Sequence, residues 1–317
     1  MLPLVLLWTD QANVYWKAIE NAGLGDRLEI QSVRREETPN AQQLERTELM
    51  LAWHAAPGLI ERMPRLRWIQ TLSVGVGAWL KRPDLHAGIA LTCARGVHRV
   101  QMPENILGAL FHLTKHYAEY NINQRDRRWA KRNSEPLAGK TLGILGLGTI
   151  GQELARKAAA LELHVIGTKR SPQPLAHVDK VYPPQATDEV LGQSDYVVLL
   201  LPDTRETDGF MNALRFRAMR STAYLLNFGR GALVIDEDLV EAVRSKTIAG
   251  AVLDVFRREP LPPDHPFWTT EGITVLPHIG GSHPQRDRIV AGLFVENLRR
   301  YLSGEPLLQL VDRTKGY

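Results

Sequence analysis

The sequence predicts a two-domain α/β protein in which each domain has a parallel sheet covered by helices. Its 317 residues exceed what one compact core usually holds and suit two domains. Short apolar runs alternate with helical stretches along most of the chain, which is typical of doubly wound parallel sheets. A glycine-rich turn at residues 146–151 restarts this alternation as an independent second unit.

The first unit is expected to begin with a buried strand at residues 2–8, followed by a helix at 14–21 that ends at Gly23. Further strands are expected at residues 28–33, 48–53, 66–71 and 89–93. The apolar run at 2–8 is too short to span a bilayer, and no basic residue precedes it. We therefore expect neither a signal peptide nor a membrane segment, and the cytoplasm is the expected location.

A long helix is expected after Pro103, because proline suits a helix first turn and apolar residues then recur at helical spacing. It should end in the basic stretch at residues 125–136. The second unit then continues with a helix at 152–161 and with strands at 141–145, 165–167, 196–201, 223–227, 250–255 and 273–276.

The last helix, residues 286–302, follows the final strand of the second unit and is expected to cross back to the first unit. This gives a discontinuous, flavodoxin-like substrate domain at residues 1–98 and 283–317. A nucleotide-binding domain at residues 99–282 is inserted in it, with a cleft between the two domains. There are no repeats at the periods typical of solenoids.

Composition excludes several classes of function. Lys plus Arg exceed Asp plus Glu by only 39 − 35 = 4, and the densest basic stretch, residues 125–132, is interpreted as a solvated helix end rather than a nucleic-acid arm. Cys93 is the only cysteine, so no disulfide forms within the chain and no cysteine-based metal site is expected. We expect no nucleic-acid, membrane or metal partner, whereas a mild basic excess suits small anionic ligands.

The glycine-rich turn is Gly146-Leu147-Gly148-Thr149-Ile150-Gly151, between an expected strand and an expected helix. In this context the G-x-G-x-x-G pattern is typical of a Rossmann dinucleotide-binding domain. Gly146 permits the tight turn, Gly148 lets the backbone approach a pyrophosphate, and Gly151 lets helix and strand pack closely. The helix N-terminus, with Thr149 and Ile150, then offers N–H groups to the anion. A turn that serves packing alone is the alternative.

The residues after the next strand decide between the two nicotinamide cofactors. An NAD enzyme usually carries Asp or Glu there to bind the adenosine ribose hydroxyls, and this chain has Thr168, Lys169, Arg170 and Ser171 instead. Arginine binds a 2′-phosphate through two hydrogen bonds, and hydroxyls also donate to it. We expect NADP(H), with NAD possible but less favoured. A solvent-exposed basic turn without a ligand is the alternative.

Three segments that follow expected strands carry residues for chemistry, at the sheet edge where ligands bind in open α/β folds. They are Asn227–Gly231, Asp254–Pro262 and Pro277–Gly281. Reduction of a 2-keto acid requires a cation for the carboxylate and a proton for the forming alkoxide. Arg230 can clamp the carboxylate, His278 can supply the proton because imidazole exchanges it near neutral pH, and Glu259 can favour the imidazolium.

Each of these three residues alone has an ordinary structural alternative, such as an ion pair, a loop cap or a core histidine. Their order and their shared position after strands favour the catalytic interpretation. On these motifs the chain resembles the D-isomer specific 2-hydroxyacid dehydrogenases over nearly its full length. The resemblance implies that Arg230, Glu259 and His278 act together and that Asp254 holds the nicotinamide carboxamide. The resemblance also implies that Leu201 and Pro202 lie along the cofactor, and Phe228, Gly229 and Gly280 of the matching motifs are expected to bind it as well.

In the first unit, residues 72–77 resemble the family's substrate loop. Backbone N–H groups at Ser73, Val74 and Gly75 would bind the substrate carboxylate, whereas a simple glycine turn is the alternative. Trp53-His54 before this loop resembles the glyoxylate/hydroxypyruvate reductase A branch. Trp53 would limit the pocket to short substrates, but a core aromatic is an almost equal alternative.

One departure from the family pattern concerns the segment Cys93-Ala94-Arg95-Gly96, where many members carry an Asn-Thr-Pro-Gly-like sequence. Arg95 and Arg99 are expected to reshape the mouth of the site, which leaves the substrate open. Two alternatives therefore stay: a dehydrogenase for a larger or phosphorylated D-2-hydroxy acid, and a non-enzymatic dinucleotide sensor. The resemblance also implies a homodimer, with the helix after Pro103 at its interface.

Overall fold

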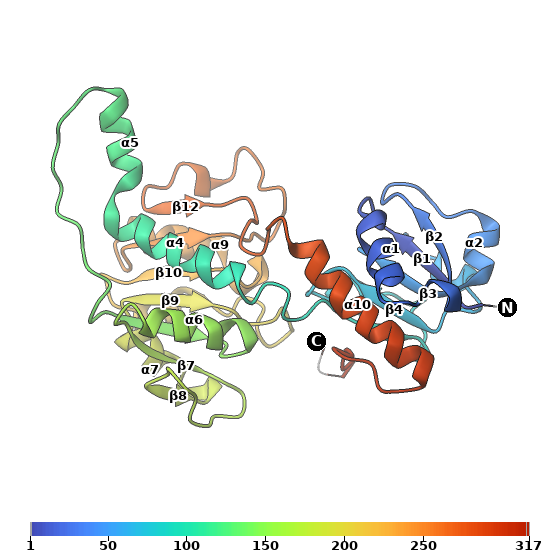
Figure 1. Ribbon diagram of the computed structural model, residues 1–317. Coiled ribbons are helices and arrows are strands. Elements are labelled where there is room, and N and C mark those ends of the chain that lie inside the picture. Colours follow the sequence, from blue (N-terminus) through green and yellow to red (C-terminus); the bar gives the residue numbers. More distant parts are fainter. Residues whose placement is uncertain (1, 315, 317) are drawn as a thin grey trace. The chain divides into compact units, whose positions relative to one another are not determined.

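The computed structural model describes residues 2–314 and residue 316. It divides into two compact units, the first formed by Met1–Val97 with His283–Tyr317 and the second by His98–Ser282. Each unit has one parallel sheet with helices on both faces (Figure 1). The predicted fold class, two parallel-sheet α/β domains, is confirmed.

The sheet of the first unit has the strand order β2-β1-β3-β4-β5, and all its pairings are parallel. This is the order of a flavodoxin-like doubly wound sheet. Its strands are β1 (Leu4–Trp8), β2 (Glu29–Val33), β3 (Thr47–Ala52), β4 (Trp68–Thr71) and β5 (Ala90–Thr92). Its helices are α1 (Ala12–Asn21), α2 (Ala41–Arg46), α3 (Gly77–Leu80) and α10 (Arg286–Ser303).

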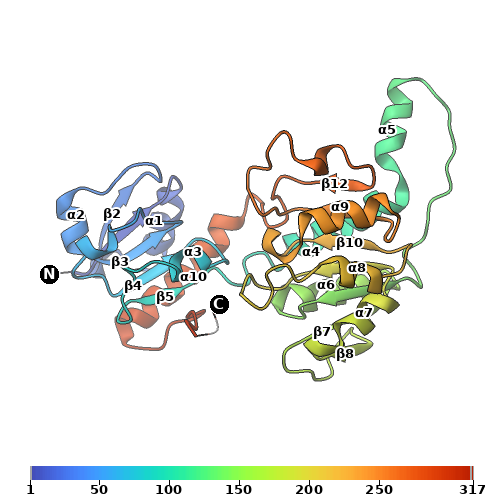
Figure 2. The ribbon, with the colours of Figure 1, turned by 180° about the vertical axis from the view of Figure 1, so that it is seen from behind.

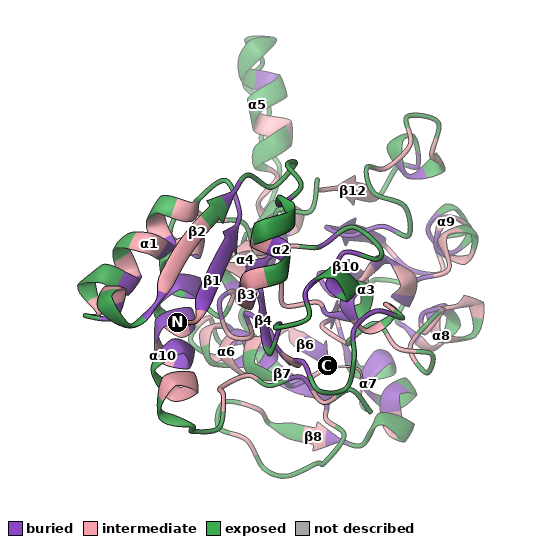
Figure 3. Ribbon diagram, turned by 90° about the vertical axis from the view of Figure 1, so that its right-hand side faces the viewer, coloured by how far each residue is buried: buried purple, intermediate pink, exposed green. Residues whose placement is uncertain are grey.

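Two apolar layers fill the first unit. On one face α1 and α10 pack together, and Phe294 of α10 lies against Trp68, with ring centroids 5.4 Å apart, and against Tyr15. On the other face Leu44, Ile60 and Trp79 join the core. Strand β1 is buried along its whole length and reads as an uninterrupted apolar run, whereas the edge strand β2 is mostly only partly buried (Figure 3).

The sheet of the second unit has seven parallel strands in the order β12-β11-β10-β9-β6-β7-β8, which is a Rossmann arrangement around β6. The strands are β6 (Thr141–Leu145), β7 (His164–Thr168), β8 (Lys180–Tyr182), β9 (Tyr196–Leu199), β10 (Tyr224–Asn227), β11 (Gly250–Leu253) and β12 (Ile273–Val275). The helices are α4 (Gln101–Lys115), α5 (Tyr117–Arg125), α6 (Thr149–Ala159), α7 (Thr187–Gln193), α8 (Ala213–Ala218) and α9 (Asp236–Arg244).

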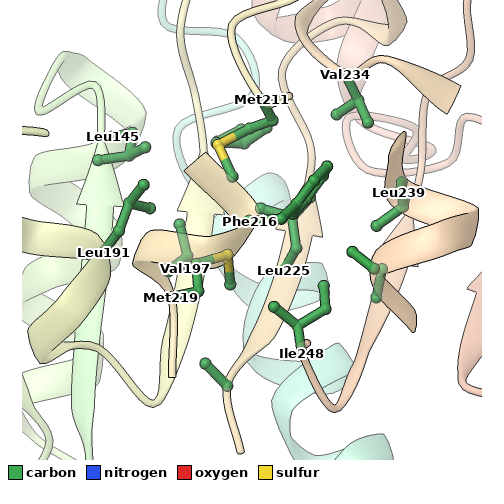
Figure 4. Packing of buried hydrophobic residues seen from close by; sticks show 14 of the residues in the cluster. Leu145, Leu191, Val197, Met211, Phe216, Met219, Leu225, Val234, Leu239 and Ile248 are labelled. Carbon is green, nitrogen blue, oxygen red and sulfur yellow. The ribbon is translucent and has the colours of Figure 1, made fainter. Parts of the chain in front are cut away.

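Helices α4 and α6 cover one face of this sheet, and α7, α8 and α9 cover the other (Figure 2). Phe216 of α8 is fully buried among side chains such as Val197, Leu225 and Met219 (Figure 4). Burying such a side chain contributes about 1.5–3 kcal/mol. This packing fixes the ends of the strands, where the functional loops begin.

Two elements differ from the sequence-based expectation. The helix after Pro103 is broken at His116, whose left-handed backbone (φ 55°) ends α4, and α5 continues as a separate helix. The short edge strand β8 was not expected. It has only three residues and pairs with β7 alone, so its sequence carries little periodic signal.

Over residues 2–314 and residue 316, no helix has the length and apolar character needed to cross a membrane. In the same part of the chain, no three His, Cys, Asp or Glu side chains gather as a metal site would require.

Candidate active site

The glycine turn between β6 and α6 has the shape that a dinucleotide requires. Gly146 has φ +112°, and a Cβ there would lie 2.7 Å from the Leu200 carbonyl oxygen. A Cβ on Gly151 would lie 2.4 Å from the Gly146 oxygen, so helix and turn pack too closely for a side chain. A Cβ on Gly148 would meet no atom within 4 Å, which leaves open space beside the backbone there. These environments match the three glycine roles of a pyrophosphate loop.

Helix α6 begins directly after this turn, and Gly148 caps it without a side-chain hydrogen bond. Gly148 and Thr149 are exposed and Ile150 is partly exposed, so the N–H groups of the first turn face open space. Such an uncapped N-terminus, with its positive dipole end, binds anions. The residues present therefore fit the diphosphate of a nicotinamide dinucleotide.

The basic turn after β7 lies beside the glycine turn. Leu147 N–H donates to the Thr168 carbonyl (2.9 Å), and the Lys169 ammonium reaches the Leu147 carbonyl (3.4 Å). Arg170 and Ser171 are exposed, whereas Thr168 is only 4% exposed as the last residue of β7. Lys169, Arg170 and Ser171 thus form the accessible part of this turn, and Thr168 supports it from within.

The segment after β10 holds Arg230 through its neighbours. The Asn227 amide donates to the Arg230 carbonyl (3.0 Å) and accepts from Gly229 N–H (3.1 Å), while Phe228 is buried. A Cβ on Gly231 would lie 1.9 Å from the Phe256 carbonyl carbon. Only glycine therefore lets this segment pack directly on the segment that follows β11.

Arg257, after β11, ties the two segments together. Its guanidinium donates to the carbonyls of Val234 (2.7 Å) and Ala232 (2.8 Å). Burial lowers the pKa of the Arg230 guanidinium, and the nearby carboxylates of Asp203 and Glu259 oppose that shift. Since arginine stays charged at any working pH, Arg230 is a partly desolvated cation with one N–H on the Gly229 carbonyl (2.7 Å).

The structure brings His278 and Glu259 together. His278 Nδ1 lies 2.6 Å from Glu259 Oε2, and Glu259 Oε1 accepts the Phe256 N–H (2.9 Å). Both oxygens of the Glu259 carboxylate are thus engaged, and one of the two ring nitrogens of His278 is held by it. His278 has φ +52°, a left-handed conformation that is uncommon for a residue with a side chain and occurs at functional sites.

Asp254 anchors the loop that carries His278. Its carboxylate accepts the N–H groups of Ile279 (2.7 Å) and Gly280 (2.8 Å). Burial raises the pKa of this carboxyl group, while the two N–H donors oppose the shift. A Cβ on Gly280 would lie 2.6 Å from Asp254 Oδ2, so the contact requires glycine. Asn105 of α4 holds the other side of the loop by donating to the Ile279 and Gly280 carbonyls.

The segment after β9, with Leu201 and Pro202, completes the row of loops at this sheet edge. Thr207 Oγ1 donates to the Pro202 carbonyl (2.6 Å) and accepts from Thr204 N–H (2.9 Å), which makes a compact turn. The loops after β6, β7, β9, β10, β11 and β12 all leave the carboxyl edge of one sheet. This is the edge at which open α/β sheets bind ligands.

The remaining expected site residues lie in the first unit, after β3 and β4. Trp53 is partly buried, with the guanidinium carbons of Arg286 and Arg35 at 4.1 and 5.5 Å from its ring centroid. Ser73 Oγ donates to the Gly75 carbonyl (2.7 Å), and Ser73 N–H donates to Thr71 Oγ1 (3.2 Å). Ser73 N–H is therefore already used within the loop.

Among the described residues, the N–H groups of Val74, Gly75 and Val76 have no hydrogen-bond acceptor. The loop thus offers consecutive free donors next to Ser73. Arg99 in the second unit forms an ion pair with Glu153 of α6 (3.1 Å), a helix of the same unit. Arg95 is partly exposed in the first unit.

Several residues that support these loops were not found from the sequence. Asn105, Arg257 and Arg286 act through hydrogen bonds to backbone carbonyls that are far away in the chain. Asn227 was named only as part of its motif. A polar residue on a helix or in a loop gives no periodic or spacing signal for such a contact.

Comparison with known proteins identifies the family. The model described as the NAD binding domain of D-isomer specific 2-hydroxyacid dehydrogenases matches residues 107–280, more than half of the chain. The chain belongs to the D-isomer specific 2-hydroxyacid dehydrogenase family. The resemblance stated from the motifs is confirmed.

Several family members resemble this dehydrogenase over most of its length. Glyoxylate/hydroxypyruvate reductase A of Photorhabdus laumondii is 31% identical and covers 84% of this chain and 87% of its own. A family member from Aeromonas salmonicida has a solved structure with a TM-score of 0.90, 31% identity, and coverage of 99% and 100% of the two chains. The NADPH-dependent glyoxylate/hydroxypyruvate reductase of Sinorhizobium meliloti, solved with NADP and sulfate, has a TM-score of 0.85 and 29% identity and covers both chains fully.

Proposed function

We propose that this dehydrogenase reduces a small 2-keto acid, of the glyoxylate or hydroxypyruvate type, to the D-2-hydroxy acid with NADPH. The observation that carries the proposal is the contact of 2.6 Å between His278 and Glu259, on the same sheet edge as Arg230 and the glycine turn. A cation, a proton donor with its carboxylate and a dinucleotide loop are what this reduction needs from a protein. The family supports the reaction class.

His278 is proposed as the general acid. With Nδ1 on Glu259, its Nε2–H remains to donate a proton to the carbonyl oxygen of the keto acid. Arg230 is proposed to bind the substrate carboxylate through the N–H groups that do not reach Gly229. When bound, NADPH supplies a hydride to C2, so the carbonyl gains one hydride and one proton and becomes the hydroxyl. Asp254 and Gly280 keep the His278 loop in place.

The proposed preference for NADPH rests on the turn after β7. Lys169, Arg170 and Ser171 would hold the 2′-phosphate, and no carboxylate in that turn repels it. The S. meliloti relative is named NADPH-dependent, which agrees with this assignment. Replacing Arg170 by Asp should lower the ratio of kcat/KM for NADPH over NADH by about tenfold or more, as loss of a charge-assisted hydrogen bond implies. Equal efficiency of the unmodified enzyme with both cofactors would contradict the proposal.

Two observations support a short substrate. Trp53 and the 72–77 loop are the features of the first unit that we assign to the substrate, and the P. laumondii relative is named for glyoxylate and hydroxypyruvate. The test is the loss of NADPH absorbance with a panel of 2-keto acids of increasing size, including phosphorylated ones. The highest kcat/KM should fall on the two- and three-carbon acids. A maximum on larger or phosphorylated acids would support the first alternative, and cofactor binding without any turnover would support a sensor.

We also propose a cytoplasmic homodimer. The apolar face of α4 is used inside its own unit, since Ile106, Ala109 and Leu110 are buried against α6. The apolar residues that remain exposed lie further along the chain, on an arm formed by α5 and residues 126–136. This arm projects from the second unit (Figures 1 and 3). Tyr117, Ile122 and Trp129 are 64%, 46% and 93% exposed there. We propose that a second copy of the chain covers these exposed side chains. Light scattering should therefore give twice the mass of one chain, and Ile122→Asp should lower the measured mass toward that of one chain.

A further inference from the structure

Arg286 touches both features of the first unit that are assigned to the substrate. One Nη donates to the Leu72 carbonyl at the start of the 72–77 loop. The guanidinium carbon lies 4.1 Å from the centroid of the Trp53 ring, which is a cation–π contact. The residue is only 9% exposed, so both contacts are made by a largely desolvated cation.

The position of Arg286 in the helix argues that these contacts are the reason for its presence. It is the first residue of α10, where the positive end of the helix dipole disfavours a cation. Packing alone would be served as well by an apolar side chain at no electrostatic cost. An arginine is needed there only if its donors or its planar cation have a task.

A partly buried network holds the guanidinium in place. Asp287 Oδ1 accepts from Arg286 Nη1 (2.8 Å) and from the Tyr15 hydroxyl (2.6 Å). Tyr15 belongs to α1 and is fully buried. Burial and the Asp287 carboxylate raise the pKa of the Tyr15 phenol, so it remains a hydrogen-bond donor. The network therefore connects α1, α10, the 72–77 loop and Trp53.

We propose that Arg286 is a positioning residue of the keto-acid site, which fixes Trp53 and the backbone of the 72–77 loop in one arrangement. The free N–H groups of Val74, Gly75 and Val76 begin two residues after Leu72, whose carbonyl Arg286 holds. Loss of the guanidinium would release the loop and the indole together and would weaken keto-acid binding. This inference rests on the proposed function and adds a residue that no motif contains.

Arg35 provides a matched control. Its guanidinium carbon is 5.5 Å from the same Trp53 ring, but its side chain is 45% exposed and is paired at 3.9 Å with Glu36 rather than with the loop. Arg35→Ala removes a cation from the indole without touching the Leu72 carbonyl. It should change the KM for the keto acid less than threefold.

The experiment compares Arg286→Met, Arg286→Lys and Tyr15→Phe with the unmodified enzyme and with Arg35→Ala. For Arg286→Met the KM for glyoxylate should rise by about tenfold or more, as expected when a charge-assisted hydrogen bond is lost. Its kcat should change less than threefold, and the Kd for NADPH should stay the same. Arg286→Lys keeps a donor but not the planar cation and should be intermediate, and Tyr15→Phe should raise KM a few-fold.

A second measurement tests whether Arg286 acts through Trp53. If it does, the increases in KM caused by Trp53→Phe and Arg286→Lys should not multiply in the double variant, because coupled residues are not additive. Multiplicative effects would overturn the link to Trp53. A normal KM in Arg286→Met, or an equal rise in Arg35→Ala, would overturn the inference as a whole.

Two further outcomes keep the inference separate from folding and from the proposed function. If Arg286→Met does not fold, as judged by its melting temperature, Arg286→Lys and Tyr15→Phe decide, and normal KM values in both overturn the inference. If none of the keto acids tested makes the unmodified enzyme oxidise NADPH, the proposed function fails and the inference fails with it. Normal turnover with unchanged KM values in the variants would refute the inference alone.

Discussion

The two units carry different kinds of candidate functional group. The second unit has the side chains proposed to do chemistry, Arg230, Glu259 and His278, each after a strand of one sheet. In the first unit, the features assigned to the substrate are backbone N–H groups and one aromatic ring, which a buried arginine contacts. The difference teaches that a sequence motif can name reactive side chains directly, whereas for a loop that works through its backbone only the fold shows which N–H groups are free, as Ser73 illustrates.

The largest expected effect lies in the second unit. Replacing His278 by Ala removes the proposed general acid and should lower kcat for reduction by about 10²–10⁴-fold. The Kd for NADPH should stay the same, because the glycine turn and the basic turn are untouched. Single-turnover absorbance and a cofactor titration measure the two quantities. A loss below tenfold would mean that another group supplies the proton and would break the contrast between the units.

Arg230 is expected to have the next largest effect. Arg230→Ala removes a charge-assisted contact worth about 1.5–3 kcal/mol, so kcat/KM for the keto acid should fall by about 10–150-fold. Arg230→Lys should also be poor, because an ammonium cannot reproduce the two-pronged contact. Steady-state kinetics at saturating NADPH provides the measurement. A variant with near-normal kcat/KM would show that substrate binding depends on residues of the first unit and not on Arg230.

Glu259→Gln sharpens the same comparison by removing a charge while keeping the shape of the side chain. The carboxylate contacts His278 Nδ1 at 2.6 Å, and the amide of glutamine can keep a hydrogen bond there without the negative charge. Hydrogen bonds to charged groups contribute about 1.5–3 kcal/mol and neutral ones about 0.5–1.5 kcal/mol, so kcat for reduction should fall by about tenfold. The Kd for NADPH should stay the same. A normal kcat in the variant would show that the charge of Glu259 is not needed and that the residue only orients the ring.

The smallest expected effect lies in the first unit. Ser73→Ala removes the hydroxyl that reaches the Gly75 carbonyl (2.7 Å) and leaves every backbone N–H in place. An ordinary hydrogen bond contributes about 0.5–1.5 kcal/mol, so KM for the keto acid should rise by no more than about tenfold, with kcat unchanged. A loss as large as that of Arg230→Ala would show that the 72–77 loop also works through a side chain.

The sequence predicted most of the strand framework because buried parallel strands are short apolar runs with clear ends. The strand at residues 141–145 was placed at the bounds the structure has for β6, and α10 differs by one residue. The edge strand β8 and the break at His116 were missed, since three residues at an edge and one left-handed residue leave no pattern.

For the candidate site, the same limit separates two kinds of residue. Glu259 and His278 are 19 positions apart, yet their motifs placed both after strands, and the structure brings them into contact. Arg286 and Asn105 look like any polar residue on a helix surface. Their roles depend on carbonyls 214 and 174 positions away, and such contacts exist only once the chain is folded.

The pairing of Asp254 with two consecutive N–H groups has a consequence for hydrogen exchange. Ile279 and Gly280 lie in a loop, and loop amides usually exchange with solvent deuterium through small local openings. Here both protons are held by one buried carboxylate at 2.7 and 2.8 Å, while Asn105 holds the carbonyls of the same two residues. These two amides should be protected like those of a central strand. Asp254→Asn should lower the protection of both together, so that exchange directly reports how often the histidine loop opens.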